Sequence, residues 1–152
     1  MNYWLMKSEP DVFSIDQLKK DKTTWWTGVR NYQARNYMMK DMKPGDQVLF
    51  YHSNAEPPGI AGLAEITKLA EADLEQFDKK SQYFDPKATK EKPIWFCVQV
   101  GFVKKWPQMI SLQELRDDPS LKEMLVLQKG SRLSIQPVEK KHFDYLNKKA
   151  KA

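Results

Sequence analysis

The chain has 152 residues and a net charge of +5, with 41% hydrophobic and 30% charged residues, which is typical of one globular domain and argues against global disorder. Its one cysteine, Cys97, cannot form an intramolecular disulfide, so a secreted disulfide-rich scaffold is excluded and a reducing compartment is indicated. No apolar run reaches the ~18 residues of a membrane-spanning helix and the first residues do not resemble a signal peptide, so we expect a cytoplasmic protein with no membrane partner.

Short apolar runs and helix caps define the first elements. The apolar run at 3–6 predicts a buried strand. Ser14 and Gln17 have capping-box spacing, which predicts a short helix through Leu18. An aromatic turn is expected at 25–28, where two tryptophans precede a threonine and a glycine.

The middle of the chain alternates between strong elements and one long polar segment. Apolar residues every four positions predict a helix over 31–42, and β-rich apolar runs predict strands at 47–52 and 60–66. The segment 71–93 has no clean period, so we expect a loop with at most a short helix, of the length that is usually functional or mobile. The longest strand is predicted at 95–103.

The C-terminal part begins with two helix caps. Ser111 opens a second capping box, and Asp118 precedes a proline at a first helical position. Alternating residues predict a last strand at 130–135, and Pro137 is expected to start a C-terminal helix. The last fourteen residues hold five lysines and two acidic residues, so charge alone is a weak sign of nucleic-acid binding. We expect one domain over 1–148 and a basic tail at 149–152.

The elements show no βαβ alternation, which favours an α+β domain. We expect a curved mixed sheet or small β-barrel of five to six strands surrounded by short helices.

Catalytic devices are scarce in this sequence. It has no nucleophile elbow, zinc-protease motif or phosphate-binding glycine loop, and its thiol and imidazole ligands are too few for a metal site. Cys97 fits a core thiol, His142 fits a surface position, and His52 fits a structural hydrogen bond. We therefore expect a binding protein with no metal and no cofactor, rather than an enzyme.

Aromatic and polar residues gather in the N-terminal third. Trp26 stands in a polar turn, where its indole could stack on a planar ligand or could plug a core edge. Lys7, Ser8 and Glu9 follow the first strand, where they could read hydrogen-bonding edges of a ligand or form an ordinary loop.

The start of the predicted helix at 31–42 carries further candidates. Arg30 and Asn31 lie where free backbone N–H groups favour a phosphate, although Asn31 could serve only as the helix N-cap. Arg35 lies one turn further on.

Three long segments resemble the EVE domain family: 3–10 (YWLMKSEP), 26–38 (WTGVRNYQARNYM) and 48–53 (VLFYHS). Shorter matches extend the resemblance over nearly the whole chain, at 58–62, 83–86 and 130–138. The resemblance implies a PUA-like fold, similar to that of YTH domains, which bind a methylated RNA base in an aromatic cage. It also implies a nucleic-acid-binding protein that reads a modified base, with modified cytosine in DNA as the leading candidate and a modified RNA base as the alternative. Such a reader has no nuclease of its own and would act with a separate effector protein.

The resemblance and the residue patterns point to one pocket with Trp26 as its wall. The expected base-binding residues are Lys7, Ser8, Glu9, Trp26, Arg30, Asn31, Tyr51, Ser53, Tyr83 and Asp85, with Arg35 and Arg132 on the nucleic-acid backbone. The alternative from another functional class is a small-molecule or nucleotide-metabolite binder or enzyme that uses the same pocket. A third hypothesis is a protein-interaction module that uses the polar segment 71–93.

Overall fold

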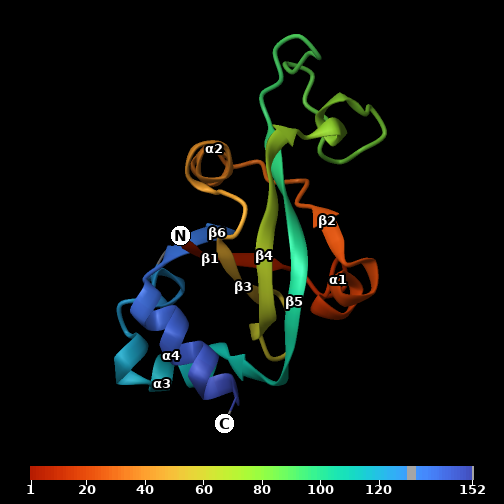
Figure 1. Ribbon diagram of the computed structural model, residues 1–152. Coiled ribbons are helices and arrows are strands. Elements are labelled where there is room, and N and C mark those ends of the chain that lie inside the picture. Colours follow the sequence, from red (N-terminus) through yellow and green to blue (C-terminus); the bar gives the residue numbers. More distant parts are fainter. Residues whose placement is uncertain (130–132, 152) are drawn as a thin grey trace.

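A computed structural model describes residues 1–129 and 133–151 of the chain (Figure 1). Their strands form one mixed sheet in the order β2-β5-β4-β3-β1-β6. The strands are β1 (Tyr3–Ser8), β2 (Thr23–Trp25), β3 (Gln47–His52), β4 (Gly59–Ala72), β5 (Phe96–Ser111) and β6 (Ile135–Val138). The helices are α1 (Ile15–Asp21), α2 (Tyr32–Asn36), α3 (Leu112–Asp117) and α4 (Lys140–Lys151). The expected α+β fold, with five to six strands and short helices, is confirmed.

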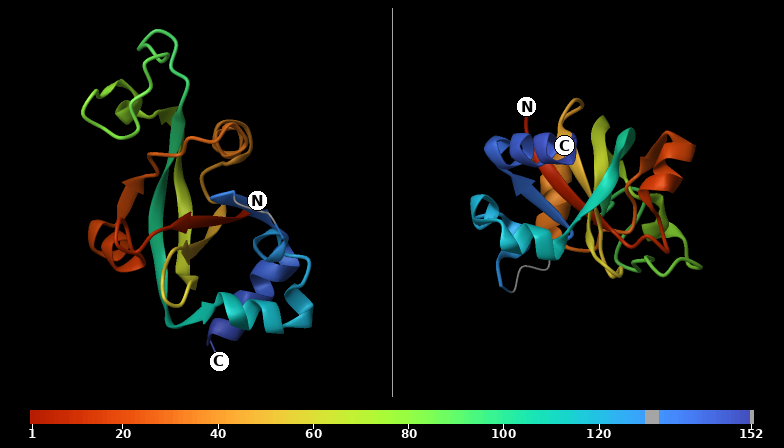
Figure 2. Two further views of the ribbon diagram at one scale, coloured as in Figure 1. Left: turned by 180° about the vertical axis from the view of Figure 1, so that it is seen from behind. Right: turned by 90° about the horizontal axis from the view of Figure 1, so that it is seen from below.

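The parallel pair β1–β3 lies inside the sheet, and the other pairings are antiparallel. Strands β4 and β5 form a long hairpin, and the loop that joins them projects from one end of the molecule (Figure 1). Figure 2 shows α3 and α4 at the opposite end of this hairpin, away from α1 and β2.

Two buried clusters lie on opposite faces of the sheet, because successive side chains of a strand point to opposite faces. In β1, Trp4 and Met6 belong to the first core and Leu5 belongs to the second core. The first core is completed by α1 and α2, and the second core by α3 and α4. The alternation within one apolar run therefore assigns neighbouring side chains of β1 to two different cores.

The predicted helix caps are confirmed. Ser14 Oγ accepts a hydrogen bond from the Gln17 amide at 3.1 Å, and Ser111 Oγ accepts one from the Glu114 amide at 3.1 Å. The helix predicted over 31–42 is α2 followed by a π-helical turn at Tyr37–Asp41. These local signals positioned the helices correctly because a cap depends only on residues within one turn.

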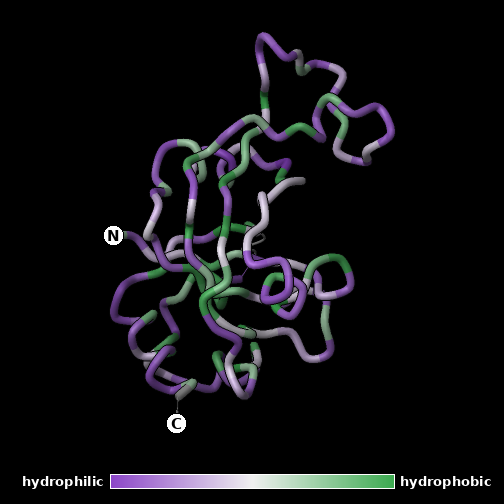
Figure 3. Tube along the Cα trace, turned by 45° about the vertical axis from the view of Figure 1, so that its right-hand side comes forward, coloured by the Kyte–Doolittle hydropathy of each residue, from purple (hydrophilic) through white to green (hydrophobic). Residues whose placement is uncertain are grey.

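Several boundaries differ from the prediction. The first residue of the turn expected at 25–28, Trp25, is the last residue of strand β2. Both hairpin strands are longer than the apolar runs that predicted them. The segment 71–93 starts as the end of β4 and contains a 3-10 helix at Leu74–Phe77. Figure 3 shows that the projecting loop is mostly hydrophilic, which explains the absence of a periodic signal.

The predicted last strand at 130–135 is wrong in its position. The strand is β6, and it extends through Pro137, which lies opposite Trp4 of β1. A proline is tolerated there because β6 is an edge strand. The C-terminal helix therefore begins at Lys140 rather than at Pro137. Residues 130–132 lie outside the described residues, and Arg132 is among them.

The surface position expected for His142 is also wrong, because this residue is only 4% exposed. It lies on α4 beside Phe143, which packs in the second core. Helix α4 continues to Lys151, within the segment expected as a basic tail, and Lys149 Nζ lies 3.4 Å from the Asp118 carboxylate. In the described part of the chain, no helix has both the length and the apolar character needed to cross a membrane.

Candidate functional site

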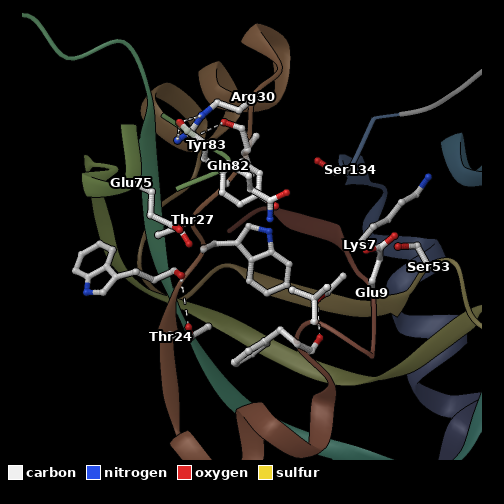
Figure 4. Close-up of a pocket in the computed structure, with 17 residues that line it drawn as sticks. Lys7, Glu9, Thr24, Thr27, Arg30, Ser53, Glu75, Gln82, Tyr83 and Ser134 are labelled. Atoms are coloured by element: carbon white, nitrogen blue, oxygen red, sulfur yellow. Dashed lines mark hydrogen bonds between the residues drawn. The ribbon is translucent and has the colours of Figure 1, made fainter. Parts of the chain in front are cut away.

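A pocket of about 800 Å³ opens where the end of β1 meets the segment after β2 and the projecting loop. Figure 4 shows Lys7, Glu9 and Ser53 on one side of this pocket and Glu75 with Thr27 on the other. The residues that line it are Lys7, Ser8, Glu9, Val12, Phe13, Thr24, Trp25, Trp26, Thr27, Gly28, Val29, Arg30, Ser53, Glu75, Gln82, Tyr83 and Ser134. Seven of the ten residues predicted to bind a base are in this set: Lys7, Ser8, Glu9, Trp26, Arg30, Ser53 and Tyr83.

The end of β1 supplies a cation to the pocket. The Lys7 side chain is half-buried, and burial lowers the pKa of its ammonium. Its Nζ lies 5.8 Å from the centre of the Tyr51 ring, and no carboxylate of residues 1–129 or 133–151 forms an ion pair with it. A partly desolvated cation without a counter-ion attracts an anion or a hydrogen-bond acceptor.

Hydrogen bonds hold the neighbouring strand ends in place. Ser8 Oγ donates to the Phe13 carbonyl at 2.6 Å, and the Ser53 amide donates to the Ser8 carbonyl at 3.0 Å. The side-chain amide of Asn54 donates to the carboxylate of Glu9. The Ser8 hydroxyl proton is therefore used within the protein, and this oxygen can only accept a bond from a ligand.

Trp26 both lines the pocket and packs in the first core. It is 8% exposed, and its ring meets the Phe50 ring edge-on at 5.5 Å between centroids. Its backbone amide donates to the Val98 carbonyl at 2.9 Å, which ties the segment to β5. Its indole N–H has no acceptor among the described residues. Trp26 therefore packs at the edge of the core, as one of the two alternatives predicted, and it also faces the pocket.

The opposite wall is held by an ion pair between the partly buried Arg30 and the fully buried Asp73. Arg30 Nη1 lies 3.0 Å from Asp73 Oδ2, and Nε and Nη2 both donate to the Tyr83 carbonyl, at 3.2 and 2.9 Å. The same Asp73 oxygen accepts from the Gly28 amide at 2.9 Å. Arg30 therefore fixes the Tyr83 loop against the segment at 26–30, and most of its N–H groups are already bonded.

Gly28 allows Tyr83 to approach the backbone. Its φ of +85° is in the left-handed region, and a Cβ at this position would lie 2.9 Å from two atoms of the Tyr83 ring. A glycine is needed there because any side chain would both strain the backbone and displace the ring.

Sequence reasoning missed the polar groups that the projecting loop brings to the pocket. Glu75 is half-buried, and its Oε1 accepts from Ser81 Oγ at 3.3 Å. Gln82 is exposed and also lines the pocket. The segment 71–93 has no periodic pattern that predicts these residues. Its one local signal is Asp73, which stands directly before the turn that contains Glu75 and can cap it. This cap is present, since Asp73 Oδ1 accepts from the Glu75 amide at 2.9 Å.

Three predicted base-binding residues do not line the pocket. Asn31 caps α2, with its Oδ1 accepting from the Ala34 amide at 3.0 Å. Tyr51 is buried in the second core, where burial raises the pKa of its hydroxyl. Asp85 accepts a hydrogen bond from the Trp95 indole at 2.9 Å, which lowers the pKa of this carboxyl. These residues support neighbouring structure.

His52 and Cys97, the side chains that the sequence analysis considered for catalysis, do not line the pocket. His52 Nε2 accepts a hydrogen bond from the Ile15 amide at 3.1 Å, as the sequence predicted. Cys97 is a buried core thiol, as predicted, and burial raises its pKa to about 12. Neither group is free to act on a ligand in the pocket.

Comparison with known proteins gives one family over nearly the whole chain. The EVE domain family matches residues 2–149. Human thymocyte nuclear protein 1 is 42% identical over 164 residues, which cover 95% of this chain and 72% of the human protein. The chicken protein of the same name is 42% identical over 163 residues, which cover 95% of this chain and 66% of that protein.

Solved structures agree with this assignment. A protein of unknown function from Leishmania major is 50% identical, with a TM-score of 0.94 over 99% of this chain and 95% of that chain. Human THYN1 in complex with DNA that contains 5-methylcytosine is 42% identical, with a TM-score of 0.92 over 100% of this chain and 99% of that chain. An ASCH protein from Zymomonas mobilis, only 8% identical with a TM-score of 0.53, shares the fold alone.

Proposed function

The chain belongs to the EVE domain family, and we propose that it is a non-catalytic reader of DNA that binds a 5-methylcytosine base in the pocket beside Trp26. The observation that carries this proposal is the structure of human THYN1 in complex with DNA that contains 5-methylcytosine. Human THYN1 is 42% identical to this chain, and the match covers 100% of this chain and 99% of the human one.

The size and walls of the pocket support a single base as its ligand. A volume of about 800 Å³ is within the range of small-ligand sites. A base in duplex DNA must leave the stack to enter such a pocket, at a cost of a few kcal/mol. Stacking on an aromatic side chain returns roughly 1–3 kcal/mol per base. Trp26, which is held rigidly by Phe50 and Val98, can supply this contact with little loss of side-chain freedom.

The polar groups of the pocket suit cytosine. Cytosine offers an exocyclic amino donor, and a carboxylate is a natural acceptor for it. Glu75 supplies a half-buried carboxylate on the loop side. The ring nitrogen and the carbonyl oxygen of cytosine are hydrogen-bond acceptors, and the Lys7 ammonium is an available donor for them.

A methyl group would be read by apolar contact. Val12 and Phe13 line the same pocket as the polar groups and can enclose a small apolar substituent. One methyl in an apolar niche contributes about 1–3 kcal/mol. We therefore expect a preference for methylated over unmethylated cytosine of about tenfold to a hundredfold.

The test is fluorescence-anisotropy titration at one fixed salt concentration, with DNA oligomers that carry cytosine or 5-methylcytosine. Trp26→Phe is expected to reduce the methyl preference at least several-fold, because a base that is stacked less firmly no longer holds its methyl group against Val12 and Phe13. Trp106→Phe is the matched control, since Trp106 is buried in the second core and does not line the pocket. Equal binding of both oligomers by the wild type would contradict the proposal.

Two further arms separate the alternatives. Methylated RNA of the same sequence tests whether the strand must be DNA. The free 5-methylcytosine nucleoside tests for a small-molecule binder, and tighter binding of the nucleoside than of the strand would favour that alternative. Recovery of unchanged DNA after long incubation is expected for a non-catalytic site.

A further inference from the structure

An aromatic platform, formed by Tyr32 of α2 and by Trp95 just before β5, lies outside the pocket. Tyr32 is 59% exposed, and its ring stacks on the Trp95 ring at 4.9 Å with an angle of 28°. Trp95 is only 6% exposed, and its indole donates to Asp85. An exposed tyrosine is thus held flat against a fixed support.

The outer face of the Tyr32 ring is open. The Arg35 guanidinium lies 4.8 Å from the centre of the Tyr32 ring and 5.9 Å from that of Trp95. A guanidinium on the outer face of Tyr32, which is the face turned away from Trp95, would lie well beyond 5.9 Å from the Trp95 ring, because Trp95 is 4.9 Å away on the opposite side. Arg35 therefore approaches Tyr32 from the side nearer to Trp95, and the 59% exposure of Tyr32 leaves its other face accessible.

The charge of Arg35 has no counter-ion among the described residues. Its Nη1 donates to the Ile94 carbonyl at 3.0 Å, and its Nε and Nη2 donate to Asn36 Oδ1 at 3.2 and 2.9 Å. Both partners are neutral, so they orient the guanidinium without cancelling its charge. An oriented arginine of this kind is suited to a phosphate.

The platform adjoins the pocket through Arg30. The Arg30 guanidinium lies 5.3 Å from the Trp95 ring and 5.3 Å from the Tyr83 ring. Tyr83 lines the pocket, and Trp95 supports Tyr32. A short single-stranded segment that leaves the pocket can therefore reach the platform.

We propose that Tyr32 and Arg35 form a second nucleic-acid contact, in which a base next to the pocket-bound base stacks on the open face of Tyr32 and its phosphate pairs with Arg35. This inference rests on the proposed function, because it assumes that the pocket holds a base of a DNA strand. It assigns the methyl preference to the pocket and part of the strand affinity to the platform.

The experiment combines protein variants with DNA that lacks single bases. Tyr32→Ala, Tyr32→Phe and Arg35→Gln are titrated with a 5-methylcytosine oligomer and with versions that carry an abasic nucleotide at each neighbouring position. Tyr32→Ala is expected to weaken binding of the complete oligomer about 5- to 50-fold, with Tyr32→Phe close to the wild type. The wild type and Tyr32→Ala should bind one of the abasic oligomers with equal affinity, namely the one that lacks the base that stacks on Tyr32.

The same titrations separate this inference from the proposed function. Tyr32→Ala should lower affinity for methylated and unmethylated strands by the same factor, whereas Trp26→Phe should reduce the methyl preference. Arg35→Gln should reduce the slope of log affinity against log salt by about 0.7–0.9. The stacking contact would be overturned if Tyr32→Ala bound the complete oligomer as tightly as the wild type does. It would also be overturned if Tyr32→Ala bound every abasic oligomer more weakly than the wild type does. If the wild type shows no methyl preference, the pocket proposal fails while the abasic comparison still tests Tyr32.

Discussion

Asp73 and Arg30 form an ion pair across two segments that are 43 residues apart, with 3.0 Å between Asp73 Oδ2 and Arg30 Nη1. The Asp73 side chain is fully buried, and it also accepts hydrogen bonds from the amides of Gly28 and Glu75. One carboxylate therefore joins the Trp26 side of the pocket to the loop that carries Tyr83. The shape of the pocket depends on this contact.

Asp73→Ala is expected to destabilise the protein by about 3 kcal/mol, because it leaves a guanidinium and two amides without their acceptor. Urea unfolding monitored by tryptophan fluorescence measures the change. Asp144→Ala is the control, since it removes an exposed ion pair with Lys140 and should change stability little. Equal effects of the two variants would show that Asp73 has no special structural role.

Gly28→Ala should destabilise the protein more than Gly45→Ala does, although both glycines have positive φ, at +85° and +97°. The added methyl at Gly45 meets nothing within 4 Å, so the expected cost is the backbone strain of about 1–2 kcal/mol. At Gly28 the methyl also meets the Tyr83 ring at 2.9 Å. We expect the Tm to fall more in Gly28→Ala than in Gly45→Ala, and we expect DNA binding to weaken only in Gly28→Ala. Similar behaviour of the two variants would argue against a close Tyr83 contact.

His52 makes stability depend on pH in a predictable direction. Burial lowers the pKa of this imidazole below its ordinary value of 6.5, and its Nε2 must be unprotonated to accept from the Ile15 amide. The unfolded chain binds the proton more tightly, so the His52 contribution is present above pH 6.5 and is lost as pH falls through the folded-state pKa. The Tm difference between wild type and His52→Gln should therefore shrink between pH 7 and pH 5. A pH-independent difference would contradict this assignment.

Cys97 should resist thiol reagents in the folded protein. Its pKa of about 12 leaves little thiolate at pH 8, and the side chain is buried in the first core. We expect alkylation by iodoacetamide to be about a thousandfold slower than in urea-unfolded protein, based on thiolate fraction alone. Fast native labelling would indicate that this part of the sheet opens frequently.

Glu75→Gln tests how the proposed site selects cytosine. A carboxylate only accepts hydrogen bonds, whereas an amide also donates and can therefore pair with the thymine carbonyl. The preference for 5-methylcytosine over thymine at the bound position should fall about tenfold or more. Competition titration with the two oligomers measures this ratio, and an unchanged ratio would remove Glu75 from base selection.

Local signals and a long motif match allowed much of the architecture to be predicted from the sequence. Caps such as Ser14 and Ser111 depend on contacts within one helical turn, and the alternation of Trp4 and Leu5 assigns side chains to opposite faces. The three long segments that carry the family resemblance supplied Lys7, Trp26 and four other predicted residues that line the pocket.

The tertiary structure decided what the projecting loop contributes and what covers each face. Glu75 and Gln82 come from a segment without periodicity, and only the pairing of β4 with β5 brings them to the pocket. His142 is buried because α4 packs over the second core, which the lysines around it did not indicate. Arg30 serves as a clamp rather than a free cation because Asp73 meets it from a distant segment. Local patterns encode contacts within a few residues, whereas these contacts form only when the sheet brings distant segments together.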